Sequence, residues 1–144
     1  MPGDSIALAS DHAGFELKAS LASWLRDEGY EVLDLGTTGP DSVDYPDYAD
    51  RMAEAIRTGR ARRGVLVCGT GIGISIAANR HRGIRCALCH DTTSARLSRQ
   101  HNDANVIALG ARMIGDAVAR DSVAAFLSTA FEGGRHARRI EKLS

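Results

Sequence analysis

Three kinds of feature are scarce in this sequence of 144 residues, and each scarcity excludes a class of protein. No apolar run approaches the roughly 20 residues that a membrane-spanning helix needs. The 18 basic and 18 acidic residues cancel, so no basic field is available to hold a nucleic acid backbone. Three cysteines, an odd number, do not suggest a disulfide framework. We therefore expect reduced thiols and neither a nucleic acid nor a membrane as partner.

The start of the chain also lacks the pattern of a secretory signal. No basic segment is followed there by an apolar one. We therefore expect a cytoplasmic location.

Short apolar runs alternate regularly with segments of helical periodicity. The runs predict strands at residues 6–9, 31–35, 65–67, 83–89 and 106–109. Between and after them, helices are predicted around 17–28, over 48–58, from 74 onward, and over 92–100, 114–131 and 135–143. Such alternation indicates one α/β domain spanning residues 1–144, a Rossmann-like three-layer α/β/α sandwich with a five-stranded parallel sheet. The pattern leaves the order of the strands open.

The segment around the third predicted strand organises the chain. After the strand comes Cys68, then glycines at positions 69, 71 and 73, and helical spacing resumes at Ile74. The glycines match neither the P-loop nor the G-x-G-x-x-G pattern. They do bring several backbone N–H groups together at a helix N-terminus, which suits an anion or a developing oxyanion. A tight turn without any ligand explains the same glycines equally well.

Cys68 lies at the carboxyl end of a predicted parallel strand, where open α/β sheets bind their ligands. The N-terminus of the following helix favours a thiolate there. Thr70 is close enough in sequence for its hydroxyl to hydrogen-bond the sulfur. A buried, inert thiol is the commoner role of a free cysteine, so Cys68 by itself decides nothing.

Other polar residues stand at the ends of predicted elements. Asp11 and His12 follow the first strand and should share the edge of the sheet with Cys68, although Asp11 could simply cap the next helix. His101 follows the fourth helix, whose C-terminus it could cap. Arginines follow the last strand and the Gly133–Gly134 break. A solvated basic face is the usual meaning of such a run, but the arginine bias suits a phosphate clamp.

A C-x-x-C-H pattern at residues 86–90 matches the attachment site of c-type haem. Its two cysteines lie in a predicted strand, where residues three apart point to opposite faces. Haem attachment also needs export, for which no signal is visible. We interpret the match as a coincidence.

Five motifs occur in a fixed order along nearly the whole chain. They are Ser-Asp-His-Ala-Gly at 10–14, Asp-Tyr-Pro at 44–46, Cys-Gly-Thr-Gly-Ile-Gly-Ile-Ser-Ile-Ala-Ala-Asn at 68–79, Ser-Arg-Gln-His-Asn-Asp at 98–103 and Glu-Gly-Gly-Arg-His at 132–136. Together they closely resemble ribose-5-phosphate isomerase type B, within the wider family that includes galactose-6-phosphate isomerase subunits.

The resemblance implies an aldose–ketose isomerase of the pentose phosphate pathway that interconverts ribose 5-phosphate and ribulose 5-phosphate. No metal or organic cofactor is implied. Cys68 would move a proton between C2 and C1 through an enediolate, with Thr70 assisting the thiol. His101 would donate a proton in ring opening, with Asp11 nearby. The resemblance further implies sugar binding by Asp11, His12, Gly69, Thr70, Gly71, Ile72, Gly73 and Asn102, and phosphate or substrate contacts by His12, Arg112, Arg135 and Arg139.

The family's site lies between subunits, so His101 and the arginines would reach the Cys68 of a partner chain. The resemblance thus implies a homodimer, possibly paired into a homotetramer, with the C-terminal helix packed on the partner. Two alternatives stay open: the same chemistry on a six-carbon sugar phosphate such as allose or galactose 6-phosphate, and a non-catalytic module that binds a sugar phosphate.

Overall fold

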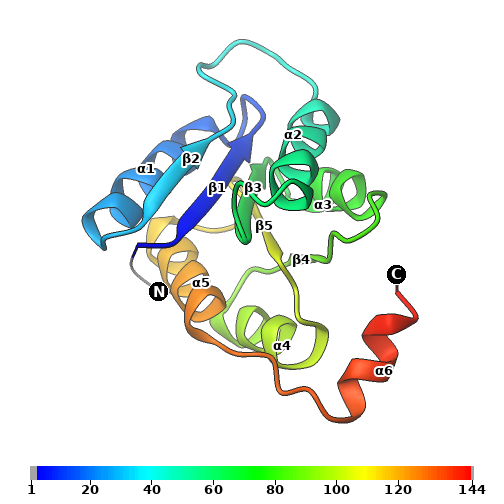
Figure 1. Cartoon of the computed structure of the whole chain (residues 1–144). Helices are drawn as coiled ribbons and strands as arrows, with labels where there is room; N and C mark the ends of the chain where they lie inside the picture. The colour runs from blue at the N-terminus through cyan, green and yellow to red at the C-terminus, as the bar shows by residue number, and fades with distance from the viewer. Residues whose placement is uncertain (1–2, 144) are drawn as a thin grey trace.

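A parallel sheet of five strands forms the centre of the molecule, as the computed structural model of residues 3–143 shows (Figure 1). The remaining residues of the expected unit 1–144 lie outside the described part. In spatial order the strands are β2 (Glu31–Asp34), β1 (Ser5–Ser10), β3 (Arg63–Cys68), β5 (Val106–Gly110) and β4 (Cys86–Leu88). The predicted α/β sandwich and its parallel sheet are confirmed.

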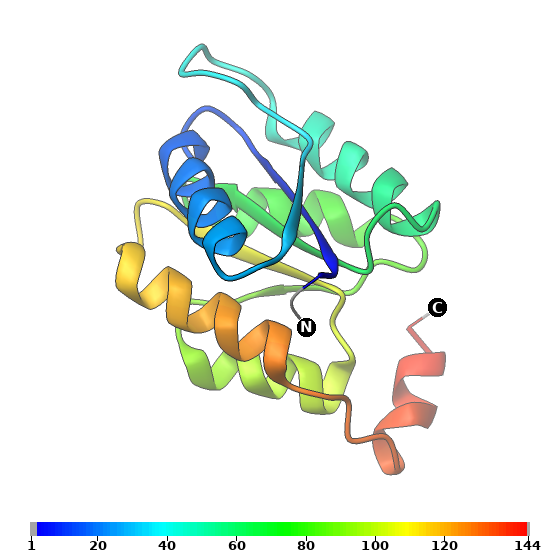
Figure 2. The same ribbon diagram turned by 60° about the vertical axis from the view of Figure 1, so that its left-hand side comes forward.

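Helices cover both faces of this sheet (Figure 2). One face carries α1 (Phe15–Asp27), α4 (Thr92–Asn102) and α5 (Asp116–Ser128), and the other carries α2 (Tyr45–Arg57) and α3 (Ile72–Asn79). The last helix, α6 (Arg135–Glu141), contacts α4 and stands away from the sheet (Figure 1). No helix within residues 3–143 is long and apolar enough to cross a membrane.

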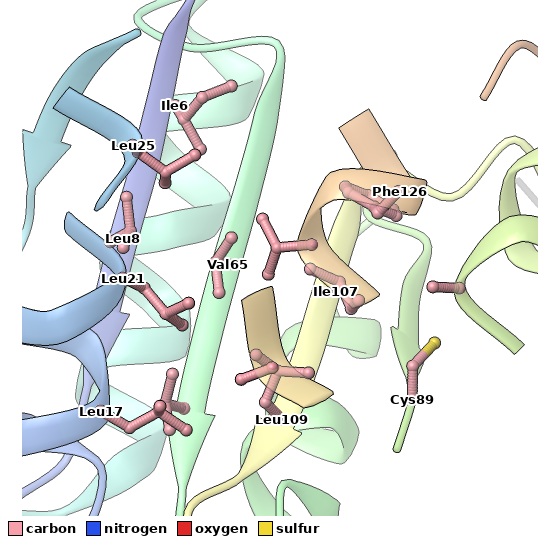
Figure 3. Packing of buried hydrophobic residues seen from close by; sticks show 14 of the residues in the cluster. Ile6, Leu8, Leu17, Leu21, Leu25, Val65, Cys89, Ile107, Leu109 and Phe126 are labelled. Atoms are coloured by element: carbon pink, nitrogen blue, oxygen red, sulfur yellow. The ribbon is translucent and has the colours of Figure 1, made fainter. Parts of the chain in front are cut away.

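Successive side chains of the central strands point to opposite faces of the sheet and so divide the core into two clusters. In β3, Val65 and Val67 pack beneath α1 and α5, whereas Leu66 and Cys68 pack beneath α2 and α3. Figure 3 shows the first cluster, in which Phe126 and leucines of α1 meet the strand side chains. Apolar side chains on both faces of a strand are the mark of a buried parallel sheet. Cys68 therefore extends from the sheet towards α2 and α3.

Most elements differ from the predicted bounds by one or two residues, and three differ by more. Helix α2 begins at Tyr45 instead of residue 48, because Pro46 occupies the first turn, where a missing N–H costs nothing. Helix α5 ends at Ser128, since the backbone of Thr129 is extended. Strand β4 has three residues because it lies at the edge of the sheet and pairs with β5 alone.

The topology creates one place where a ligand crevice is expected. Strands β2 and β3 lie on opposite sides of β1, and β5 and β4 lie beyond β3. The direction in which strands are added to the sheet therefore reverses between β2 and β3. Parallel sheets bind ligands at such a switch point, beyond the carboxyl ends of the strands. Asp11 and Cys68 stand at these ends, immediately after β1 and at the last position of β3.

Candidate active site

A crevice of about 430 Å³ opens at this switch point. Its walls come from the segments after β1, β3 and β5 and from the start of α2. The lining residues are Asp11, His12, Ala13, Tyr45, Cys68, Gly69, Thr70, Ile72, Gly73 and Arg112. The structure thus brings together most of the polar residues that the sequence predicted for one edge of the sheet.

Cys68 lies in the wall of the crevice and receives a backbone hydrogen bond. The N–H of Gly71 donates to its Sγ with an N–S distance of 3.1 Å. Gly71 adopts a left-handed conformation, with φ at 78°, that turns the chain back so that its amide reaches the sulfur. A donor aimed at the sulfur suits a thiolate.

The hydroxyl of Thr70 does not make the contact expected of it. Its Oγ1 accepts a hydrogen bond from the N–H of Ile72 at 3.1 Å, and the bond to the Cys68 sulfur comes from Gly71 instead. The structure therefore does not show the hydrogen bond expected between Thr70 and the thiol, and the role of Thr70 stays a prediction. The side chains of Cys68 and Thr70 thus each accept a hydrogen bond from an amide of the loop, and within residues 3–143 the N–H groups of Gly69, Thr70 and Gly73 donate no hydrogen bond.

Asp11 and His12 are held by backbone amides. The N–H of Gly14 donates to Asp11 Oδ1 at 3.1 Å. Gly14 itself is the N-cap residue of α1, so Asp11 holds the turn before the helix and is not the helix cap that competed with a substrate role. The N–H of Val43 donates to Nδ1 of His12 at 3.1 Å. Because Nδ1 accepts, a neutral His12 carries its proton on Nε2, and no residue in the described part of the chain accepts a hydrogen bond from that N–H.

Arg112 lies beside the glycine loop of its own chain. Its N–H donates to the carbonyl of Gly69 at 2.9 Å, and its side chain runs past Gly69, where an added Cβ would meet Cδ and Nε at 3.5 Å. A guanidinium at the crevice can bind a phosphate or another oxyanion in two-point fashion.

Tyr45 is the lining residue that the site prediction missed. Its ring packs so closely on Gly73 that an added Cβ there would lie 2.5 Å from Tyr45 Cζ. Tyr45 as a whole residue is 39% exposed. Its position in the Asp-Tyr-Pro motif at 44–46 was the available signal.

The other predicted site residues lie at the opposite edge of the sheet. Helix α4 runs from the carboxyl edge back to Asn102, shortly before β5 begins at Val106. Cys68, by contrast, pairs with Gly110 at the far end of β5. One chain therefore does not bring His101 and Asn102 to its own Cys68.

His101 belongs instead to a cluster with the segment around α6. Its ring stacks on that of His136, with centroids 4.5 Å apart and an angle of 15° between the planes. Burial, followed by the charges of Arg135 and His101, lowers the pKa of His136. Ligating atoms of His101, Glu132 and His136 all lie within 4.8 Å of one another, the one such group among the described residues. Arg135 and Arg139 stand on α6, apart from Arg112.

The C-x-x-C-H segment forms no joint site. Cys86 packs in the cluster beneath α2 and α3, and Cys89 in the one beneath α1 and α5, as expected of a strand. Burial raises the pKa of both thiols. Two protonated thiols on opposite faces do not hold one haem or metal.

Comparison with known proteins places the chain in a family. A family model described as Ribose/Galactose Isomerase matches residues 6–143. The chain belongs to this family. Ribose-5-phosphate isomerase B of Escherichia coli is 48% identical over 139 residues, covering 96% of this chain and 93% of that protein. D-erythrulose-4-phosphate isomerase of Pectobacterium atrosepticum is 46% identical over 141 residues, covering 96% and 92%.

A solved structure agrees with the assignment to the ribose/galactose isomerase family. The crystal structure of a ribose 5-phosphate isomerase from Thermotoga maritima superposes with a TM-score of 0.96, at 54% identity over 97% of each chain. The resemblance inferred from five motifs is thereby confirmed, and so is the expected class of enzyme, a sugar phosphate isomerase.

Proposed function

We propose that this chain interconverts ribose 5-phosphate and ribulose 5-phosphate, with Cys68 as the base. The observation that carries the proposal is the hydrogen bond from the Gly71 amide to the Cys68 sulfur within a crevice that also holds Arg112. The E. coli and T. maritima relatives bear names that specify ribose 5-phosphate. A non-catalytic binding module would need no thiol held in this way.

The proposed chemistry moves one proton along the sugar. The Cys68 thiolate removes the proton from C2 of the open-chain aldose, and the electron pair of that C–H bond forms the C1–C2 double bond of an enediolate. The carbonyl oxygen takes up negative charge, which the N–H groups of Gly69, Thr70 and Gly73 can stabilise. A proton passes from the hydroxyl oxygen on C2 to the oxygen on C1, and the thiol returns the proton it took to C1. The C2 carbonyl of the ketose then forms without any external oxidant or reductant. Positioned proton transfer of this kind contributes about 10²–10⁴-fold.

A second copy of the chain would complete the site. His101, Asn102, Arg135 and Arg139 lie away from the crevice of their own chain, so we propose that they serve the crevice of a partner in a homodimer. Within that dimer, His101 would donate the proton that opens the sugar ring, and the arginines would hold the phosphate together with Arg112 and His12.

Exposed apolar side chains beside the crevice support such a partner. Ile72 and Ile76 of α3 are 50% and 62% exposed, and Leu88 lies next to the glycine loop. Contiguous apolar surface next to a site is typical of an interface. Helix α6, which stands away from the sheet, is the element best placed to pack on the partner (Figure 1).

A direct assay tests the proposed reaction. Purified chain with a chelator present should isomerise ribose 5-phosphate, with a higher kcat/KM than for allose 6-phosphate or erythrulose 4-phosphate. A difference of one carbon changes binding by about 1–3 kcal/mol, so we expect a preference of about 10–200-fold. A clear preference for another sugar phosphate would reassign the substrate and leave the chemistry in place.

Replacement of the thiol tests the chemistry itself. Cys68→Ala should lower kcat by at least about 10²-fold, because the positioned base is lost. Binding of a non-reacting sugar phosphate, measured by calorimetry, should survive, since the arginines and glycine amides remain. Activity within a few-fold of the unmodified enzyme would show that Cys68 is not the base.

A further inference from the structure

The end of α4 and the segment leading into α6 bring two imidazoles and a carboxylate together. His101, Glu132 and His136 each offer one ligating atom, and these atoms lie within 4.8 Å of one another. Backbone contacts hold the arrangement: the N–H of Glu132 donates to the carbonyl of Gln100 at 3.1 Å, and that of His136 to the carbonyl of Gly133 at 3.1 Å.

His136 is the fixed member of this cluster. Its side chain is buried, with 6% of the residue exposed, and its Nε2 has no hydrogen-bond partner within the described part of the chain. The nearest carboxylate oxygen, Oε1 of Glu132, lies 3.6 Å away, which is too far for a hydrogen bond. A buried ring nitrogen without a partner is unusual and calls for an explanation, such as a ligand that it binds.

The donor set is one that zinc prefers. Two imidazole nitrogens and one carboxylate oxygen make a three-residue Zn²⁺ site with a fourth position open. With bonds of about 2.0–2.1 Å, neighbouring ligand atoms of a tetrahedral site lie about 3.3 Å apart. The pair His136–Glu132 already approaches that spacing at 3.6 Å. The exposed side chain of Glu132 and the half-buried ring of His101 can rotate to close the remaining distance.

We propose that His101, Glu132 and His136 form a binding site for Zn²⁺ or a similar transition-metal ion. The ion would act as an inhibitor and not as a cofactor, because it takes His101 away from the substrate; this consequence rests on the proposed function. The positive charges of Arg135 and Arg139 oppose a cation at this place. The site should therefore bind zinc reversibly, and less tightly than the same three ligands would without these arginines.

Direct binding measurements test the site without reference to activity. In isothermal titration of the folded protein with Zn²⁺, we expect one ion per chain. Glu132→Gln should raise the dissociation constant at least about tenfold, since even the loss of a supporting contact around a metal costs that much. Glu141→Gln, which removes an exposed carboxylate of α6, should leave it unchanged. The test does not depend on His136→Asn, a substitution of a buried ring that can unfold the protein. Glu132 is exposed, so Glu132→Gln measures the contribution of the site without that risk.

Cobalt distinguishes this site from the thiol of Cys68. Co²⁺ added to the unmodified protein should give visible ligand-field bands without the near-ultraviolet charge-transfer band of a thiolate ligand. A thiolate band, or zinc binding by Glu132→Gln as tight as that of the unmodified chain, would overturn the proposal.

Kinetics then test the consequence for catalysis. Zn²⁺ should inhibit competitively with the sugar phosphate, a chelator should restore activity, and Glu132→Gln should need about tenfold more zinc for the same inhibition. The two proposals fail separately. Zinc binding without any isomerisation would contradict the proposed function alone, whereas isomerisation without zinc binding would contradict the metal site alone.

Discussion

The N–H of Gly71 donates a hydrogen bond to the sulfur of Cys68 over 3.1 Å. The contact is possible because Gly71, at φ 78°, reverses the chain just before α3 begins at Ile72. The glycine loop therefore holds the thiol, in addition to the substrate-binding role that we propose for its amides. This double use explains why its three glycines are spaced unlike those of a nucleotide-binding loop.

Alanine should be tolerated differently at Gly71 and at Gly83, because only Gly71 is closely packed. Both residues have positive φ, so alanine costs about 1–2 kcal/mol at either. Only at Gly71 would the new Cβ clash, lying 2.6 Å from Leu88 Cδ1 and 2.9 Å from the carbonyl carbon of Leu109. We expect Gly71→Ala to lower the free energy of unfolding by about 2–4 kcal/mol in all and to reduce kcat at least about tenfold.

Gly83→Ala is the matched control, because nothing lies within 4 Å of its added Cβ. It should lose about 1–2 kcal/mol in stability and keep its activity. Denaturant unfolding and the isomerase assay measure both quantities. Equal effects of the two substitutions would mean that the close approach at Gly71 is unimportant.

The three thiols should differ in reactivity towards iodoacetamide near neutral pH. Burial raises the pKa of Cys86 and Cys89, so the reactive thiolate form of each is depleted at pH 7.5. Cys68 lies in the crevice wall with a hydrogen-bond donor on its sulfur. Peptide mapping by mass spectrometry should find Cys68 modified first, and a sugar phosphate should slow its modification. Labelling of Cys86 or Cys89 as fast as Cys68 would contradict this assignment.

Neighbouring arginines on α6 allow a controlled test of the phosphate contacts. Arg135→Ala and Arg139→Ala should each raise KM by about 10–100-fold, because a hydrogen bond to a charged group contributes about 1.5–3 kcal/mol. Loss of binding away from the reacting carbon should change kcat less than KM. Arg138 is also exposed on this helix, and Arg138→Ala should change neither constant. If all three variants behave alike, α6 provides only a general positive charge.

The sequence predicted the strands and helices well because short apolar runs and the helical periodicity between them are local signals. Cys68, Asp11 and Arg112 could be assigned to one edge for the same reason: all three lie at or just beyond the carboxyl ends of parallel strands. Tyr45 was missed because Pro46 made the start of α2 look like loop. The expected contact of the Thr70 hydroxyl with the thiol is not seen, since adjacency in sequence does not fix which group a side chain meets once the backbone turns.

The strand order and the cluster around His136 lay beyond such reasoning. Both depend on contacts between segments far apart in the chain. The stack of His101 on His136, for example, joins α4 to α6 across more than thirty residues.

The central claim is that Cys68 and His101 of different copies make one site, and mixed dimers test it most directly. Cys68→Ala and His101→Asn chains, each nearly inactive alone, can be co-expressed with two different tags so that heterodimers are purified. In each heterodimer one site would combine both substituted residues and be inactive. The other site would combine the intact Cys68 of one chain with the intact His101 of its partner. We predict about half the activity of the unmodified dimer, as two-fold symmetry requires. Heterodimers as inactive as either parent would contradict a site shared between chains.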